Sequence, residues 1–326
     1  MVRPAPHTKP AAIPFPADLA NPADPRIKHR LQPWDGEAAD IVIIGVPFDE
    51  GVLLNGGRPG AIEGPSAFRQ ALLRFGTTHD AGRATDFDQL SLADAGDLET
   101  VSGDPAATHN RLAEAVAAIL QTGAIAVVIG GGNDATFGSA KGLQQRFTSI
   151  GGVNIDAHLD MREVLDGICH SGTPYRRIIE ELGVRGSHLV TLGLHSAVNS
   201  QAHMAWARER QVGLWGLERL REGGTANVLA GELHRLAGQA EGLFVSIDLD
   251  VFAAAYAPGV SAPGTEGLTA EEGRALAYEA GRAAKVRLFE LMELSPPHDT
   301  DNRTSRLAAL LLHAFLAGVA QRQQEG

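Results

Sequence analysis

Six short runs of the chain are apolar at nearly every position, a pattern typical of β-strands that are covered on both faces. These runs are Ile41–Val46, Ala124–Ile129, Gly152–Asp156, His188–Leu194, Leu243–Asp250 and Val286–Leu294. Between and beside them lie stretches in which apolar positions recur with helical spacing: Pro65–Phe75, Pro105–Gln121, Ala135–Phe147, Gln201–Arg210, Val228–Ala240, Ala270–Ala283 and Thr304–Gln321. The alternation predicts an α/β fold in which helices cover both faces of a parallel sheet.

The first 33 residues have a different composition, because they hold eight of the 17 prolines. Proline at this density disfavours both helix and strand, so we expect residues 1–33 to form an extended N-terminal arm. The composition does not shift again after residue 40, and no internal repeat is present. The sequence therefore predicts a proline-rich arm over 1–33 and a single domain over 34–326.

The charge of the chain excludes two classes of partner. Its 326 residues include 28 Lys and Arg against 39 Asp and Glu, a net charge of −11, which repels nucleic-acid phosphates and anionic lipid. We see no apolar run of membrane-spanning length and no N-terminal signal pattern. The one cysteine, Cys169, excludes an internal disulfide framework and a zinc ribbon. These features predict a soluble, cytoplasmic protein that binds neither nucleic acid nor membrane.

Acidic residues close two of the apolar runs. Asp156, His158 and Asp160 alternate along one run, so they share a face if the chain stays extended, and Asp248 and Asp250 do the same on another. An isolated Asp-x-Asp at a strand end is usually a helix cap, a turn or a solvated rim. Four carboxylates at the ends of two buried strands would repel one another and would be costly to bury, however. Divalent cations between them are the natural remedy, and the ligands suffice for two.

These motifs resemble those of the ureohydrolase family, which includes arginase, agmatinase and formimidoylglutamase. Asp-Ala-His-Leu-Asp at 156–160 resembles its second metal motif, and Ser-Ile-Asp-Leu-Asp-Val-Phe at 246–252 its third. The segment Gly-Gly-Arg-Pro-Gly-Ala at 56–61 resembles its early glycine-rich loop. The resemblance spans roughly residues 40 to 320. It implies a three-layer α/β/α, arginase/deacetylase-like fold with a central parallel sheet of about eight strands, and one ureohydrolase-like catalytic domain over 34–326.

The resemblance also implies a metal-ligand set: Asn133, Asp156, His158, Asp160, Asp248 and Asp250. The family normally has histidine where this chain has Asn133, and an amide oxygen is a neutral, weaker donor than imidazole. Asn133 either binds weakly, leaves a water in its place or leaves one site empty, and Asp134 is an alternative ligand if the loop backbone rotates. Five oxygen donors and one nitrogen favour Mn²⁺ over Zn²⁺. The resemblance independently implies manganese, with two ions per chain expected and one site in question at Asn133.

Asp160 and a further residue, Glu293, take chemical roles by the same resemblance. Two cations about 3.5–4 Å apart would lower the pKa of a shared water enough to supply hydroxide near neutral pH. Asp160 would accept the proton, and Glu293, in Glu-Leu-Ser-Pro-Pro, would pair with the cationic head of the substrate. The expected catalytic residues are therefore Asp160 and Glu293.

Three segments resemble the formimidoylglutamase branch of the family: Ser-Gly-Thr-Pro-Tyr at 171–175, Asp-Met-Arg at 160–162 and Asp-Thr-Asp-Asn-Arg-Thr at 299–304. The implied substrate-binding residues are Arg162, Ser171, Gly172, Thr173 and Glu293. Arg162 either holds a substrate carboxylate or neutralises the acidic cluster, and the sequence does not separate these two roles.

The sequence therefore predicts a manganese-dependent hydrolase of an amidine or guanidine C–N bond in a small linear substrate, with formimidoylglutamate, a compound of histidine metabolism, favoured. One alternative is an agmatinase or another hydrolase of guanidino compounds. A second is a metal-poor pseudoenzyme that acts as a binding or regulatory subunit, which Asn133 motivates and the other ligands argue against. The resemblance further implies a homo-oligomer, either a trimer or a hexamer.

Overall fold

A ten-stranded sheet forms the centre of the computed structural model, which describes residues 5–11, 24–80 and 85–325. The strand order is β1-β6-β3-β7-β12-β11-β8-β9-β10, and β2 also pairs with β6. Every pairing in this sheet is parallel except that of β1 with β6. The strands are β1 (Thr8–Lys9), β2 (Leu31–Pro33), β3 (Ile41–Gly45), β6 (Leu92–Leu98), β7 (Ile125–Ile129), β8 (Ile150–Ile155), β9 (Leu189–Leu194), β10 (Gly213–Gly216), β11 (Gly242–Asp248) and β12 (Val286–Met292). A separate two-stranded sheet pairs β4 (Thr78–Asp80) with β5 (Thr85–Asp86).

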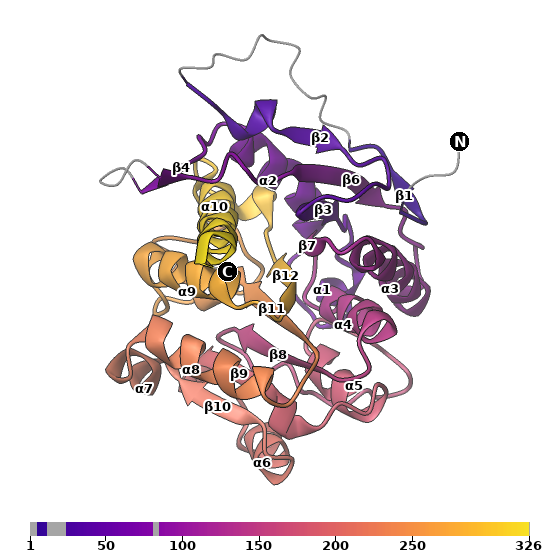
Figure 1. Ribbon diagram of the computed structural model, residues 1–326. Helices are drawn as coiled ribbons and strands as arrows, with labels where there is room; N and C mark the ends of the chain where they lie inside the picture. Colours follow the sequence, from indigo (N-terminus) through magenta and orange to yellow (C-terminus); the bar gives the residue numbers. More distant parts are fainter. Residues whose placement is uncertain (1–4, 12–23, 81–84, 326) are drawn as a thin grey trace.

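Helices cover the two faces of the large sheet in two groups (Figure 1). On one face α3 packs against α4, and α4 against α5; on the other, α10 packs against α2 and α9, and α8 against α7 and α9. The helices are α1 (Glu50–Leu54), α2 (Gly64–Leu72), α3 (Pro105–Gln121), α4 (Ala135–Arg146), α5 (Pro174–Glu180), α6 (Gln201–Glu209), α7 (Leu217–Glu222), α8 (Thr225–Ala237), α9 (Ala270–Arg282) and α10 (Arg303–Glu325). The predicted three-layer α/β/α fold is confirmed, with ten strands in place of about eight.

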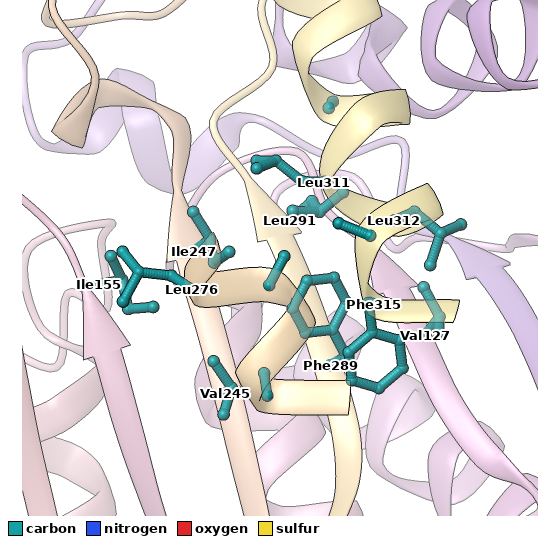
Figure 2. Packing of buried hydrophobic residues seen from close by; sticks show 14 of the residues in the cluster. Val127, Ile155, Val245, Ile247, Leu276, Phe289, Leu291, Leu311, Leu312 and Phe315 are labelled. Carbon is teal, nitrogen blue, oxygen red and sulfur yellow. The ribbon is translucent and has the colours of Figure 1, made fainter. Parts of the chain in front are cut away.

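Alternation along the buried strands divides the core between the two faces. On β12, Leu288 faces the α3–α4 side while Phe289 faces the α9–α10 side, as successive strand residues must. The ring of Phe289 stacks on that of Phe315 from α10, with centroids 4.2 Å apart (Figure 2). Burying a side chain of this size contributes about 1.5–3 kcal/mol. The apolar packing on both faces leaves the ends of the strands as the place for polar chemistry.

All six predicted strands and all seven predicted helices are present, but the sheet also contains strands that were not predicted, two of them beyond the N-terminal arm. One is β6, which carries Asp94 and Asp97 in a buried position and therefore lacks an apolar pattern. The guanidinium of Arg69 on α2 compensates these acids, since its Nε donates to Asp94 at 2.7 Å and its Nη1 to Asp97 at 2.6 Å. The other is β10, a four-residue edge strand that is only half-buried. Both were missed because their burial depends on partners distant in the sequence.

The N-terminal arm is not free of regular structure. Thr8–Lys9 and Leu31–Pro33 form short strands against β6, and Ile27–His29 forms one turn of 3-10 helix. The expectation that proline excludes strand and helix here is wrong at these places, where the pairing segments are only two or three residues long. The remaining prolines between residues 12 and 23 lie outside the described residues. The division into an arm and one domain stays a prediction.

One helix is long and apolar enough to cross a membrane by length and composition, contrary to the expectation from the sequence that no such run exists. This helix is α10, and 78% of its most apolar 18-residue window is buried inside the protein. It packs against α9 and α2, as the core helix of a globular protein does. Its hydropathy is therefore explained by packing within the chain.

Candidate metal centre

The predicted metal-site residues meet at the carboxyl ends of four neighbouring strands, β7, β12, β11 and β8. Such edges collect functional groups in parallel sheets because the strand-to-helix loops open there. A cavity of about 300 Å³ lies at this edge, and its acidic floor includes Asp160, Asp248, Asp250 and Glu293. A larger hollow of about 480 Å³ between α2 and the start of α10 has no acidic residue in its lining. Of these two cavities, only the one at the edge of the sheet contains the acidic residues predicted from the sequence.

Two overlapping groups of side chains place their oxygen and nitrogen atoms within 4.8 Å of one another. The first consists of Asp156, His158 and Asp250, and the second of Asp156, Asp160 and Asp248. Asp156 belongs to both groups, so the two groups share one carboxylate. This is the arrangement that two divalent ions sharing a carboxylate require.

The backbone turns sharply at both acidic motifs. The strand β8 ends at Ile155, and the amide of His158 donates to Asp156 Oδ1 at 2.6 Å. In the same way the amide of Asp250 donates to Asp248 Oδ1 at 2.9 Å, where β11 ends. The chain therefore does not stay extended through either motif, and these turns, not strand alternation, bring the side chains together.

Burial and mutual repulsion dominate the electrostatics of the carboxyl groups. Burial, together with the nearby charge of Asp250, raises the pKa of Asp156 to about 6. The pKa values of Asp160, Asp248 and Glu293 are also raised, first by burial and then by the neighbouring carboxylates. Each of these shifts is one that a bound cation would reverse.

For His158 the surroundings favour the charged form of the side chain, unlike those of the carboxyl groups. Burial alone lowers the pKa of this imidazole, but the carboxylates of Asp250 and Asp156 outweigh it and raise the pKa to about 12. Its Nδ1 lies 3.0 Å from Asp250 Oδ2. A positive charge is therefore strongly favoured between these three side chains.

The donor set fits divalent cations. Asp250 Oδ1 is buried and has no hydrogen-bond partner among the described residues, although buried carboxylate oxygens are normally paired. Of the side-chain atoms in the two groups, all but the imidazole nitrogen are carboxylate oxygens, which suits a hard ion such as Mn²⁺ better than Zn²⁺.

Asn133 reaches the same centre from the loop after β7. Its Nδ2 donates to Asp160 Oδ2 at 2.8 Å and to Asp156 Oδ2 at 3.3 Å, while its Oδ1 accepts from the hydroxyl of Thr136 at 3.0 Å. The alternative ligand Asp134 does not face the acids, because its Oδ2 lies 2.7 Å from His109 Nε2 in the core. Asn133 is therefore the residue of this loop that belongs to the site.

The glycines before Asn133 hold the loop in place instead of giving it freedom. A Cβ on Gly131 would lie 1.7 Å from the carbonyl oxygen of Phe48, and one on Gly130 would lie 2.0 Å from the sulfur of Met292. Gly131 requires glycine because backbone atoms fill the space of a side chain, whereas at Gly130 the Met292 side chain would have to move. Backbone hydrogen bonds also hold this loop, from the Gly132 amide to the carbonyl of Phe48 at 2.9 Å and from the Glu293 amide to the carbonyl of Gly131 at 2.8 Å.

Glu293 lies above the acids with its backbone in the left-handed region, at φ 67°. Asp160 has φ 49°, also in this region, which costs free energy for residues other than glycine. The carboxylate of Glu293 accepts a hydrogen bond from the amide of Asn133 at 2.9 Å and lines the cavity. Two residues of one cavity thus hold a backbone conformation that costs free energy, a feature typical of functional sites.

Arg162 lines the cavity and has no carboxylate partner among the described ion pairs. Its Nη1 donates to Asn55 Oδ1 at 2.9 Å, and Asn55 Nδ2 in turn donates to Ser171 Oγ at 3.0 Å. The backbone amide of Arg162 donates to the carbonyl of Gly172 at 2.8 Å. An arginine held by an amide and not by an acid keeps its charge available to a ligand.

The predicted substrate loop is only partly in contact with the cavity. Ser171 lines it, whereas Gly172 does not and packs against the Arg162 side chain instead. Thr173 is fully buried, and its hydroxyl donates to the carbonyl of His170 at 2.8 Å. Thr173 thus lies outside the cavity lining, because the loop turns inward to begin α5.

Three polar residues that line the cavity were not predicted as site residues: Asn55, Arg58 and Ser261. Arg58 belongs to the glycine-rich segment that marked the family resemblance, and its guanidinium donates to the carbonyls of Val260 at 2.6 Å and Ser261 at 2.9 Å. The signal was therefore present as a motif, but its contact with residues some 200 positions later was not visible.

Comparisons with known proteins agree with this site. The family model described as "Arginase family" matches residues 39–318. A formimidoylglutamase of Aeromonas hydrophila is 35% identical over 297 residues, which cover 88% of this chain and 90% of that protein. Trypanosoma cruzi formiminoglutamase solved with Mn²⁺ is 34% identical, with a TM-score of 0.84 over 92% of this chain and 99% of that chain. Bacillus subtilis formimidoylglutamase has 27% identity and a TM-score of 0.87 over 93% of this chain and 94% of that chain. The chain belongs to the arginase family.

Proposed function

We propose that this protein is a manganese-dependent formimidoylglutamase, which hydrolyses a C–N bond of the linear amidine N-formimidoylglutamate. The observation that carries the proposal is the division of charge in one cavity, with carboxylates on its floor and Arg162, which has no acidic partner among the described ion pairs, on its wall. A substrate with a cationic amidine at one end and carboxylates at the other is complementary to this division. Relatives named formimidoylglutamase, similar over most of the chain, support the same substrate.

The proposed metal ligands are the six residues Asn133, Asp156, His158, Asp160, Asp248 and Asp250. Four carboxylates, an imidazole and an amide provide for two Mn²⁺ ions, and the relative from T. cruzi was solved with that metal. When bound, the ions neutralise the acids and lower the pKa of water enough to supply hydroxide near neutral pH. The position of Asn133 is the weakest of the six, since an amide is a poorer donor than a carboxylate or imidazole.

The side chains of this cavity divide the work of hydrolysis. Glu293 pairs with the cationic amidine and holds its carbon above the acids, which makes the attack effectively intramolecular. Asp160 takes a proton as the nucleophile adds and returns it to the departing nitrogen. Arg162, with Asn55 behind it, pairs with a substrate carboxylate and sets the distance between this group and the reacting carbon.

Agmatine and other guanidino compounds remain the second candidate substrates, because their cationic heads also suit Glu293. Agmatine has no carboxylate, however, so it would leave Arg162 without an acidic partner in the cavity. The available guanidinium thus favours an acidic substrate within the family.

A product assay tests the proposal. Purified protein with added Mn²⁺ is incubated with formimidoylglutamate, arginine, agmatine and guanidinobutyrate, and glutamate, ammonia and urea are measured. We expect turnover of formimidoylglutamate alone, with glutamate or ammonia identifying which C–N bond breaks. Urea release from a guanidino compound without turnover of formimidoylglutamate contradicts the substrate, and no manganese bound at all supports the pseudoenzyme.

We further propose that the protein acts in the cytoplasm as a homo-oligomer, a trimer or a hexamer, without nucleic-acid or membrane partners. The net charge of −11 supports the exclusion of polyanionic partners. Light scattering of the purified protein measures the oligomeric state directly.

A further inference from the structure

Glu290 is a fully buried acid beneath the metal centre. It lies on β12 opposite Ser246 on β11, its exposed fraction is 0%, and neither carboxyl oxygen has a hydrogen-bond partner among the described residues. Burial raises the pKa of Glu290 to about 8. Buried polar groups are normally paired, so an unpaired carboxyl in the centre of the sheet requires an explanation.

Three hydroxyl groups lie near this carboxyl and counter the rise of its pKa, those of Thr136, Ser139 and Ser246. Two of them, Ser139 and Thr136, donate to other acceptors. Ser139 Oγ donates to a carbonyl of its own helix at 3.2 Å. Thr136 Oγ1 donates to Asn133 Oδ1 at 3.0 Å and lies 3.4 Å from Ser246 Oγ. Thr136 thus stands between the unpaired carboxyl and the one amide of the candidate metal site.

The orientation of the Asn133 amide suits acids without a cation. Its Nδ2 faces Asp156 and Asp160, and its Oδ1 faces Thr136. A cation among these acids would meet N–H groups from Asn133, which repel it, and no lone pair. Turning the amide by 180° exchanges its nitrogen and oxygen without moving the other atoms, and the oxygen then faces the cation.

We propose that Thr136 and Glu290 are positioning residues that hold Asn133 as a metal ligand by reversing one chain of hydrogen bonds. With the amide turned, Asn133 Nδ2 donates to Thr136 Oγ1, and the Thr136 hydroxyl, no longer needed as a donor to the amide, donates to Glu290. Asn133, Thr136 and Glu290 are then joined by hydrogen bonds. The carboxyl of Glu290, which has no partner in the first arrangement, gains one. The inference rests on the proposed metal centre and adds to it the support for its weakest ligand.

Mn²⁺ titration of the full chain by calorimetry tests the proposal. Thr136→Val removes the hydroxyl at nearly constant volume, and Glu290→Met removes the final acceptor. Each is expected to weaken the affinity for the more weakly held ion about 10- to 100-fold, the usual effect of removing a group that orients a ligand. Thr136→Ser keeps the hydroxyl and should restore the affinity to within about threefold of the parent. Thr191→Val is the matched control, since Thr191 is also a buried threonine and its hydroxyl has no partner among the described residues.

A second background separates this role from general loss of packing. In Asn133→Ala the amide is absent, so adding Thr136→Val should change Mn²⁺ affinity less than about twofold. An equal loss in both backgrounds would show that Thr136 acts through packing and would overturn the proposal. If Thr136→Val does not fold, the same comparison is made with Glu290→Met. A loss of Mn²⁺ affinity in the parent but not in Asn133→Ala supports the proposal, and an equal loss in both overturns it.

The outcomes also separate this inference from the proposed function. A parent protein that binds no Mn²⁺ contradicts the metal centre itself. A parent that binds Mn²⁺, with Thr136→Val and Glu290→Met binding it equally well, contradicts only the positioning role.

Discussion

Buried acids gather at two places in this protein, and the chain treats them in opposite ways. On β6, Asp94 and Asp97 meet the guanidinium of Arg69, whose pKa is raised by these acids although burial alone lowers it. At the carboxyl end of the sheet, Asp156 and its acidic neighbours meet no arginine or lysine among the described ion pairs. The pKa values of Asp156, Asp160, Asp248 and Glu293 rise there because these acids are buried together. The first group is neutralised within the chain, and the second is left for something from outside.

Structural and functional buried acids differ in whether the chain itself supplies their partner. A buried charge without a partner destabilises the fold, so a set of them persists only where a ligand completes it. The Arg69 cluster links α2 to β6 and requires no ligand. At the acidic edge, formed by Asp156, Asp160, Asp248, Asp250 and Glu293, the chain supplies only the imidazole of His158 and the amides of Asn133 and Asn154 as side-chain partners among the described residues, which are too few for so many acids. Substitutions in the two groups should therefore affect different properties.

The largest expected effect is on activity, at the acidic edge. Asp160→Asn removes the proposed proton acceptor and one metal ligand, so kcat should fall about 10²- to 10⁴-fold. Because an amide in this place relieves repulsion, the metal-free protein should unfold at the same temperature as the parent or higher. Product assays and thermal unfolding in EDTA measure both. Retention of full manganese content and activity would contradict the binuclear assignment.

The opposite pattern is expected at the other cluster. Arg69→Met leaves Asp94 and Asp97 buried without a counter-charge, which should lower the free energy of unfolding by about 3–5 kcal/mol. Denaturant unfolding in EDTA measures the loss. The folded fraction should still bind Mn²⁺ with the affinity of the parent, because Arg69 does not line the cavity. A variant as stable as the parent would show that this cluster does not hold β6.

The next prediction concerns pH. The pKa of Asp156 is raised by burial to about 6, above its unfolded value near 4, so the metal-free folded state holds this proton more tightly than the unfolded state. Its contribution to stability is therefore present below pH 4 and is lost as pH rises through 6. Bound Mn²⁺ should reverse the trend and add about 2.7 kcal/mol at 100 times its Kd.

Thermal unfolding between about pH 4.5 and 7.5, in EDTA and in Mn²⁺, measures this difference. Asp156→Asn is the matched control, because its side chain does not titrate. If the stability of the metal-free parent changes with pH in the same way as that of Asp156→Asn, titration of Asp156 does not affect stability and this prediction is wrong.

Sequence reasoning predicted the fold through its apolar strands and failed where burial depends on pairing. Strands such as β8 and β11 are apolar at most positions, so their place in the sheet could be predicted from residue type alone. The strand β6 contains Asp94 and Asp97 and is buried only because Arg69, some 25 residues earlier, compensates it. Residue type alone does not reveal a partner at that separation.

The candidate site also has a part that the sequence predicted and a part that depends on distant contacts. Spacing and resemblance predicted that the acids converge, and the structure brings the side chains of Asp156, His158 and Asp250 within reach of one cation. The orientation of Asn133 and the inward turn at Thr173 could not be predicted, because each depends on hydrogen bonds to residues that the motifs do not include.

A smaller effect is expected on the wall of the cavity. Arg162→Lys keeps the charge but loses the planar fork, so KM for formimidoylglutamate should rise about tenfold while kcat stays within about twofold. Steady-state kinetics measure the two separately. Arg176→Lys is the control, since Arg176 pairs with Glu180 on α5 and does not line the cavity. Unchanged kinetics for Arg162→Lys would leave that residue in the role of neutralising the acids.

The smallest expected effect is at Asn133, where the acidic edge comes nearest to being satisfied by the chain itself. Asn133→His supplies a stronger donor, so the Mn²⁺ concentration for half-maximal activity should fall a few-fold. The gain is limited because backbone hydrogen bonds of Gly131 and Gly132 to Glu293 and Phe48 restrain the loop, so the imidazole must fit without a backbone shift. The competing hypothesis is that the site is built around the amide, with Thr136 beneath it. In that case activity falls although manganese content stays full. Titration of parent and variant, read by activity and by bound metal, separates the two, and a fall at full occupancy would make Asn133 a functional residue in its own right.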